Sequence, residues 1–175
     1  MAYAVTHVII AIVLISLYRH YIAKKKFSNW YVLIGGIAGL LPDIDVPIQW
    51  TASAIARETI EFHRIWTHSL LCVAVFLLVA LIFWMQKHKK FKMFKREWTY
   101  EQVALLFTII AAGWFIHIAL DCGLASDYNL TIIPGVPMNF CPHPFSRDTL
   151  LGIDAIILIL WLIHEEYRHN IKEFT

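Results

Sequence analysis

The sequence of 175 residues has few charged residues and few cysteines. Both shortages limit the classes of protein to which it can belong. Asp, Glu, Lys and Arg make up only 16% of the residues, whereas hydrophobic residues make up 59% and the mean hydropathy is +0.60. Soluble domains are about 45–50% apolar, so an ordinary soluble domain is excluded. The chain also lacks internal repeats and low-complexity segments. We therefore expect a single integral membrane domain over residues 1–175.

The three cysteines have no CxxC spacing, which argues against a zinc–thiolate cluster. Cys72 lies inside an apolar run and is expected to be a small core residue. Cys122 and Cys141 flank one loop and could form a disulfide if that loop faces an oxidising compartment. Two free thiols are the alternative, and the sequence leaves both open.

Long apolar runs predict an all-α bundle of about four transmembrane helices plus one short or re-entrant helix. The first run does not resemble a signal peptide, because its basic residues follow it instead of preceding it. The last run is interrupted by Asp154. The four expected spans are residues 2–18, 65–85, 103–120 and 150–163.

The short apolar segment of residues 30–41 contains three glycines that allow another helix to approach closely. It ends at Pro42, and a residue before proline is pushed out of the helical region. We therefore expect Asp43 and Asp45 on the turn that leaves a broken or re-entrant helix, with Pro47 keeping the next residues irregular. A short interfacial helix is expected over residues 50–62, a loop over 122–149 and a soluble tail over 164–175.

The basic residues predict an orientation through the positive-inside rule. With the N-terminus outside, twelve of the fifteen Lys and Arg residues fall in inner loops. Only Arg57, Arg64 and Arg147 lie outside. The protein is then expected in the inner or plasma membrane with its basic loops in the cytoplasm, where anionic lipid explains the basic loop at residues 87–96 more simply than nucleic acid.

Ligand-type side chains gather at the outer ends of the segments in this orientation, although the orientation was derived from lysine and arginine alone. His117 and Asp121 share a helix face because they are four residues apart. Acidic and imidazole groups in membrane segments are costly and usually functional. The expected metal ligands are His7, Asp43, Asp45, His63, His68, His117 and Asp121, with Asp154 as a ligand or a partner of one.

This set exceeds the three protein ligands of a typical catalytic zinc site. We therefore expect one to three divalent ions, with zinc favoured. Each motif alone also has an ordinary structural interpretation: a turn for Asp43 and Asp45, a core histidine for His7. His20, His88, His164 and His169 lie among charged residues on the inner side and are expected to be solvated, and His143 is ambiguous.

The same residues resemble a known family. Thr6-His7, Leu41-Pro42-Asp43-Ile44-Asp45, His63-Arg64-x-x-Thr67-His68-Ser69 and His117-x-x-x-Asp121 occur in the order and at the spacing of the YdjM-like membrane-bound, metal-dependent hydrolases. Pro144-Phe145-Ser146-Arg147 and Gly152-Ile153-Asp154 also resemble its C-terminal pattern. The sequence departs from the family's pattern at Ile65, where glycine is common in the family, and in the prolines of residues 134–144. A more distant similarity to zinc-dependent phospholipase C enzymes implies phosphoester cleavage.

The expected function is therefore a metal-dependent hydrolase that cleaves a phosphoester of a lipid or lipid-like substrate. Asp45, His68 and Arg64 are the expected catalytic residues, and Arg64 and Arg147 are expected to hold the anionic part of the substrate. Salt bridges to neighbouring carboxylates are the alternative for both arginines. The rival functions are a deacylase or amidase acting on lipid or lipid-linked peptide, and a non-catalytic metal binder, transporter or regulatory membrane protein.

Overall fold

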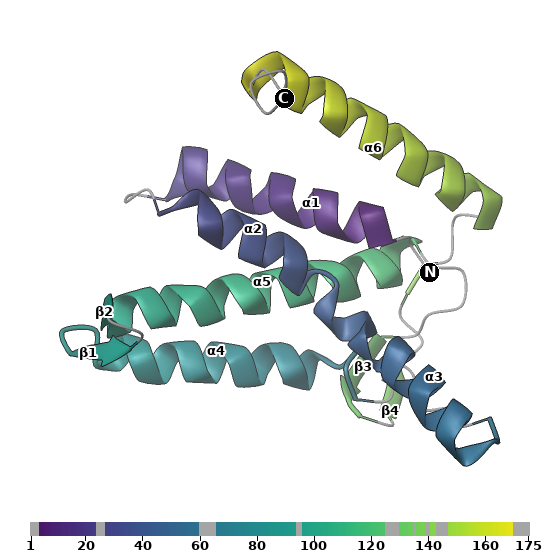
Figure 1. Ribbon diagram of the computed structural model, residues 1–175, viewed down its shortest axis with the longest axis horizontal. Coiled ribbons are helices and arrows are strands. Elements are labelled where there is room, and N and C mark those ends of the chain that lie inside the picture. The colour runs from purple at the N-terminus through teal and green to yellow at the C-terminus, as the bar shows by residue number, and fades with distance from the viewer. Residues whose placement is uncertain are drawn as a thin grey trace.

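The computed structural model describes residues 4–23, 27–59, 66–93, 96–124, 130–134, 136–138, 141–142 and 147–169. Its architecture is mostly helical, as predicted (Figure 1). The helices are α1 (Ala4–Leu17) with its π-helical extension η1 (Tyr18–Ile22), α2 (Asn29–Ala38), the 3-10 turn η2 (Leu41–Ile44), α3 (Asp45–Ala56), α4 (Leu70–Met85), α5 (Tyr100–Leu124) and α6 (Arg147–His169).

Two small antiparallel hairpins, which the sequence did not predict, interrupt the helical pattern. β1 (Lys90–Met93) pairs with β2 (Arg96–Thr99) in the basic loop. β3 (Leu130–Ile133) pairs with β4 (Val136–Met138) in the loop after α5. The apolar periodicity that marks membrane helices gives no signal for strands this short.

Two helices are long and apolar enough to cross a membrane: α1 with η1, over Ala4–Ile22, and α5, over Tyr100–Leu124. A third crossing exists if α2 and the segment Leu41–Ala56 count as one span, bent by 49° at the break. The apolar helices Leu70–Met85 and Thr149–His164 are shorter. The described residues therefore contain two or three candidate spans, with a bilayer as their environment.

The bend confirms the interpretation of residues 30–41 as one limb of a broken helix, but the turn differs from the prediction. Asp43 lies in η2, whereas Asp45 is the first residue of α3. Pro47 does not keep the chain irregular; it lies in the first turn of α3, where the missing N–H of proline costs nothing. α4 begins at Leu70 rather than near residue 65, and α6 continues past the predicted end at 163.

Glycines allow α2 to pack closely against both α1 and α5. The sequence predicted this close approach from the glycines of residues 30–41. A Cβ on Gly113 of α5 would lie 2.4 Å from the backbone oxygen of Gly35 in α2. A Cβ on Gly39, just after α2, would lie 3.0 Å from the backbone oxygen of His7 in α1. Small residues replace side-chain interdigitation here, so the three backbones approach closely enough to bring buried polar groups together.

The helices run back and forth, so that one end of the bundle collects several helix ends (Figure 1). The start of α1, the end of α2 with η2, the start of α4 and the end of α5 meet there, beside the β3–β4 hairpin. The β1–β2 hairpin lies at the opposite end. α6 packs mainly against α1, and its first turns lie at the end of the bundle that holds the β3–β4 hairpin.

Candidate metal centre

Five predicted ligands from four separate segments converge at the end of the bundle where those helices meet. His7 comes from α1, Asp43 from η2, His68 from the turn before α4, and His117 and Asp121 from α5. The three histidine side chains are 0% exposed and Asp121 is 2% exposed, whereas Asp43 is 29% exposed. The group is therefore buried in the protein, with Asp43 as its member nearest to solvent.

The donor atoms of these residues lie within ligand-to-ligand distances of one another. His68 Nε2 is 3.2 Å from Asp43 Oδ1 and 3.6 Å from Asp121 Oδ2, and His117 Nε2 is 3.5 Å from Asp121 Oδ2. His7 Nε2 is 3.3 Å from Asp121 Oδ1. Two overlapping groups share His117 and could each hold a metal ion: His7 with His117 and Asp121, and Asp43 with His68 and His117.

A backbone contact sets the tautomer of His117. Its Nδ1 lies 2.7 Å from the carbonyl oxygen of Gly39, which can only accept, so Nδ1 carries the proton and donates it. In the neutral ring Nε2 then has a free lone pair that points into the cluster. A metal-ligating histidine usually donates its other N–H in this way, which fixes the ring orientation.

The Thr67 hydroxyl and the Asp45 carboxylate set the tautomer of His68. The Thr67 hydroxyl donates to Asp45 Oδ2 over 2.6 Å, so its oxygen is left to accept from His68 Nδ1 at 3.0 Å. This arrangement assigns the proton of the neutral His68 ring to Nδ1, which leaves the lone pair of Nε2 directed into the cluster. Asp45 is thus placed on the outer side of the His68 ring, where it positions the imidazole through Thr67.

Two bare nitrogens consequently face each other, since His68 Nε2 and His117 Nε2 are 3.2 Å apart. Opposed lone pairs repel unless a cation lies between them. Asp43 Oδ1 and Asp121 Oδ1 are buried and accept no hydrogen bond of good geometry from the described residues. Donors bound at 2.0–2.1 Å in a tetrahedron are about 3.3 Å apart, so the observed spacings fit a divalent cation.

Burial lowers the pKa of His68, which precedes α4 and lies outside the candidate spans, although the nearby Asp43 opposes the shift. A pKa below its usual value keeps this imidazole neutral at pH 7. The neutral ring is the form that can bind a metal ion.

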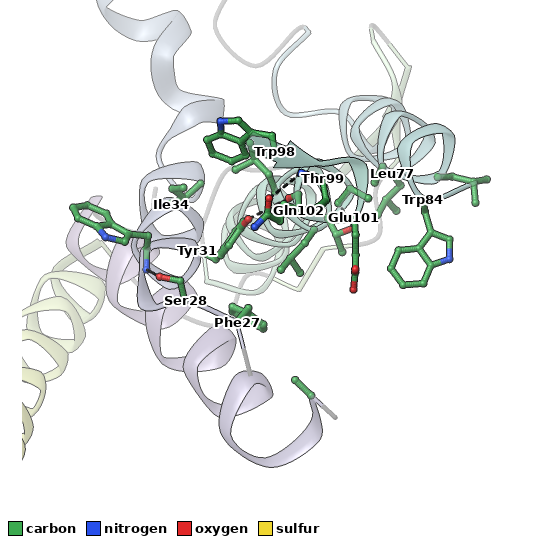
Figure 2. A pocket seen from close by; sticks show the side chains of 18 of the residues that line it. Phe27, Ser28, Tyr31, Ile34, Leu77, Trp84, Trp98, Thr99, Glu101 and Gln102 are labelled. Carbon is green, nitrogen blue, oxygen red and sulfur yellow. Dashed lines mark hydrogen bonds between the residues drawn. The ribbon is translucent and has the colours of Figure 1, made fainter. Parts of the chain in front are cut away.

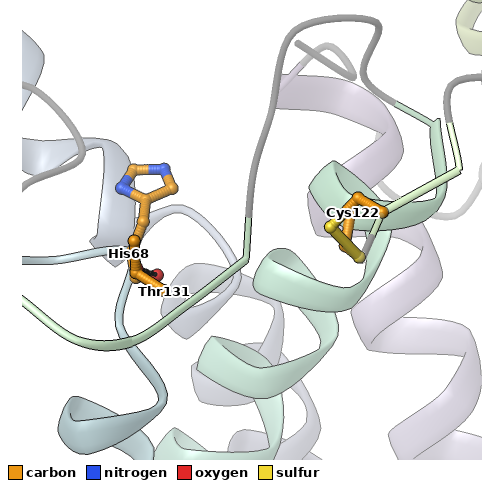
Figure 3. Close-up of a disulfide and its surroundings, with 4 residues drawn as sticks. His68, Cys122 and Thr131 are labelled. Atoms are coloured by element: carbon orange, nitrogen blue, oxygen red, sulfur yellow. Dashed lines mark hydrogen bonds between the residues drawn. A yellow bond between two sulfur atoms is a disulfide. The ribbon is translucent and has the colours of Figure 1, made fainter. Parts of the chain in front are cut away.

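The segment around His68 is held by the β3–β4 hairpin and by α5. The Thr131 hydroxyl donates to His68 O over 2.7 Å, and Trp114 Nε1 donates to Thr67 O over 2.7 Å. A disulfide joins Cys122 to Cys141, so of the two alternatives for these cysteines the structure has the paired one. Figure 3 shows this disulfide at the end of α5, and the contact between His68 and Thr131.

Asp154 is not brought into the cluster. One of its oxygens accepts from the backbone N–H of Thr6 over 2.6 Å and also from the Thr6 hydroxyl. Thr6 is in the first turn of α1, so Asp154 satisfies an N–H that no intrahelical carbonyl can reach. It thereby ties α6 to the residue that precedes His7.

Four residues that the sequence singled out cannot be placed in the site. His63 and Arg64 lie outside the described residues, as does His143. Arg147 begins α6, and its side chain lies outside the described part.

The sequence did not predict the hydrogen bonds that support the site, which involve Thr67, the Gly39 carbonyl, Thr131 and Thr6. Thr67 was visible as the neighbour of His68 in a dense polar string, which is a usable signal. The Gly39 carbonyl and Thr131 carry no such signal, because their roles depend on tertiary contacts across 78 and 63 residues.

The order and spacing of the polar motifs, now seen to converge, agree with one family. The chain belongs to the YdjM inner membrane protein family, whose sequence model matches residues 1–173. Searches of curated proteins and of solved structures gave no significant match. Membership therefore supports a membrane location, and the chemistry must be argued from the site.

Proposed function

We propose that this chain is an integral membrane metal-dependent hydrolase that cleaves a phosphoester of a lipid or lipid-like substrate. One observation carries the proposal: His68 Nε2 and His117 Nε2 lie 3.2 Å apart in a buried cluster with Asp43 and Asp121. A structural core has no use for facing lone pairs and buried carboxylate oxygens, because every such group costs stability when it lacks a partner.

The residues that would hold the cation are His7, Asp43, His68, His117 and Asp121. A set of imidazole and carboxylate donors suits zinc among the common divalent ions. Both candidate groups include His117, and its Nε2 can bind only one ion because it has one lone pair. The site could therefore hold a single ion. Asp121 directs Oδ1 toward His7 and Oδ2 toward His68 and His117, so a second ion could be bridged by this carboxylate.

A divalent ion in such a site polarises an ester and makes water a nucleophile at neutral pH. The protein's own groups prepare the site for that chemistry. Asp45 and Thr67 hold the His68 ring, while Gly39 holds the His117 ring. Asp43 faces the more open side, so substrate is expected to approach there. Arg64 and Arg147 are the proposed partners of the substrate's anionic part.

We also propose that the cluster faces the extracytoplasmic side, with the N-terminus outside and with α4 and α6 as further crossings, which gives about four spans. The disulfide beside Asp121 supports this orientation, because disulfides persist in oxidising compartments. The exposed lysines of the β1–β2 end support it as well, since positive loops remain in the cytoplasm.

The test uses the purified full-length chain in lipid nanodiscs, stripped with a chelator and then reloaded with zinc. We expect zinc-dependent release of a phosphorylated head group from phospholipid, with no release from His68→Ala. His20→Ala is the matched control, because His20 is exposed and far from the cluster along α1 and η1. Its activity should equal that of the wild type.

Other products would assign the site differently. Zinc-dependent release of fatty acid would favour the deacylase or amidase, which the same metal centre could support. Stoichiometric zinc without turnover of any phospholipid would favour a metal-binding membrane protein. Failure to bind any divalent ion would contradict the proposed function.

A further inference from the structure

A large apolar groove lies at the end of the bundle opposite the metal centre. Its volume is about 1060 Å³, slightly above the roughly 300–1,000 Å³ of small-molecule sites. Tyr31 and Ile34 of α2 line one side, and Leu77 and Leu81 of α4 line the other. Glu101 and Gln102 of α5 also line it (Figure 2). Thr108 of α5 is a further lining residue.

Tryptophans stand at the mouth of the groove. Trp30 is 71% exposed and Trp84 is 50% exposed, and both line the cavity together with Trp98 of β2. Tryptophan is enriched where the hydrocarbon core meets the lipid head groups. The groove therefore opens at the depth where a lipid changes from acyl chain to head group.

Positive charge borders the same mouth. Lys87 Nζ lies 4.9 Å above the ring of Trp84, and Arg19 Nε donates to the backbone oxygen of Phe27, another lining residue. Lys89, Lys90 and Lys92 are exposed on the adjoining hairpin region. Among the described residues here these five cations outnumber the carboxylates, which are Glu97 and Glu101.

The outer end of the groove, at the start of α5, is distant from the metal centre along that helix. Glu101 lines the groove and Asp121 belongs to the cluster, and twenty residues of α5 separate them by about 30 Å at 1.5 Å per residue. The hydrocarbon core is also about 30 Å thick. The two sites consequently lie near opposite membrane surfaces, and one lipid head group cannot occupy both.

We infer that this groove binds an anionic phospholipid of the leaflet at the basic end, with an acyl chain between α2 and α4 and the phosphate beside Lys87. An apolar groove explains affinity for any lipid, and the lysines explain a preference for negative charge. Nucleic acid would use the lysines but leave the groove and its tryptophans without a role. This inference does not depend on the proposed hydrolase activity.

The test measures quenching of tryptophan fluorescence in the full-length chain by brominated phosphatidylglycerol or brominated phosphatidylcholine, titrated into neutral detergent micelles. The wild type should reach half-maximal quenching at a mole fraction of the anionic lipid roughly fivefold lower than that of the neutral lipid. Lys87→Gln should reduce this preference by roughly fivefold. Arg57→Gln is the matched charge control, since Arg57 is exposed at the end of α3.

A second variant tests the groove itself. Thr108 is an exposed lining residue of α5, so Thr108→Phe fills the groove without disturbing the core and without adding a tryptophan. It should weaken quenching by both lipids. The inference would be overturned if the wild type reached half-maximal quenching at the same mole fraction of both lipids, or if Arg57→Gln reduced the preference as much as Lys87→Gln. Unchanged quenching in Thr108→Phe would also overturn it. Displacement of the lipid by a short oligonucleotide would overturn it in favour of nucleic acid.

Discussion

The two ends of α5 place ionisable groups in opposite ways. At one end His117 and Asp121 are buried among His7, His68 and Asp43, with nitrogens and oxygens directed at a common centre. At the other end, the lysines around the β1–β2 hairpin are exposed, and those with a described contact touch single partners such as Gln86, Glu97 or Trp84.

This difference separates two uses of charge in a membrane protein. Exposed cations cost little and are matched to anionic lipid near the membrane surface. Buried histidines and aspartates cost several kcal/mol unless something compensates them, and here Asp43 Oδ1 and Asp121 Oδ1 accept no hydrogen bond of good geometry from the described residues. The buried end therefore has a set of side chains that could hold a metal ion, while the lysines of the exposed end carry the positive charge themselves.

Removing the metal should have the largest effect, and only at the buried end. An ion at about 1,000 times its Kd stabilises a protein by about 4 kcal/mol, so chelation should lower the free energy of unfolding in detergent by about this amount. Added zinc should restore it. The same chelator should leave the unfolding of His117→Ala unchanged, and an equal loss in that variant would contradict a metal at this site.

Separating α2 from α5 should be next in size. In Gly113→Ala the new Cβ meets the backbone oxygen of Gly35, which cannot move aside as a flexible side chain would. We expect a loss of about 1–3 kcal/mol in the free energy of unfolding, measured by denaturant titration in mixed micelles. Gly152→Ala is the control, because a Cβ there meets no atom within 4 Å. Equal stability of both variants would refute the close helix contact.

Disconnecting His68 from its support should weaken metal binding without removing a ligand. Thr67→Val deletes the hydroxyl between His68 Nδ1 and Asp45, and loss of such a partner typically costs 10–100-fold in metal affinity. Competition with a zinc-chelating dye measures this affinity. Thr51→Val, which removes an exposed hydroxyl bonded to Pro47 O, should bind zinc like the wild type. A Thr67→Val protein with wild-type affinity would contradict the assigned tautomer.

The smallest effect is expected from Asp154. Asp154→Ala removes the acceptor for the first turn of α1, which should cost about 1 kcal/mol in thermal unfolding and lower zinc affinity only slightly. Ile156→Ala is the control, because the Ile156 side chain is exposed on α6. If Asp154→Ala abolished zinc binding altogether, Asp154 would have to be a ligand, as the sequence had allowed.

Much of the site was predictable because its ligands carry their own signals. His7, Asp43, His68, His117 and Asp121 are polar residues at the ends of apolar runs, and such runs start and stop at membrane surfaces. Positive-inside reasoning then put these ends together without any knowledge of contacts. The glycines before Pro42 likewise predicted the close approach of α2 to its neighbours.

The parts that the sequence left open or did not reveal depend on contacts between distant segments. Asp45 was expected to ligate, yet its place beside Thr67 follows from where α3 begins, and Pro47 supports that helix start instead of preventing it. The pairing of Cys122 with Cys141 follows from the fold of the β3–β4 segment, which has no periodic pattern. The groove at the basic end is formed by three helices together and has no motif in any one of them.

The most direct test of the account is the metal content of the chain purified from membranes without added zinc, measured by inductively coupled plasma mass spectrometry for the wild type beside His68→Ala and Asp121→Ala. We predict at least one divalent ion per wild-type chain and a loss to background in both variants. Absence of metal from the wild type, or the same amount in all three proteins, would contradict a metal centre built from these side chains.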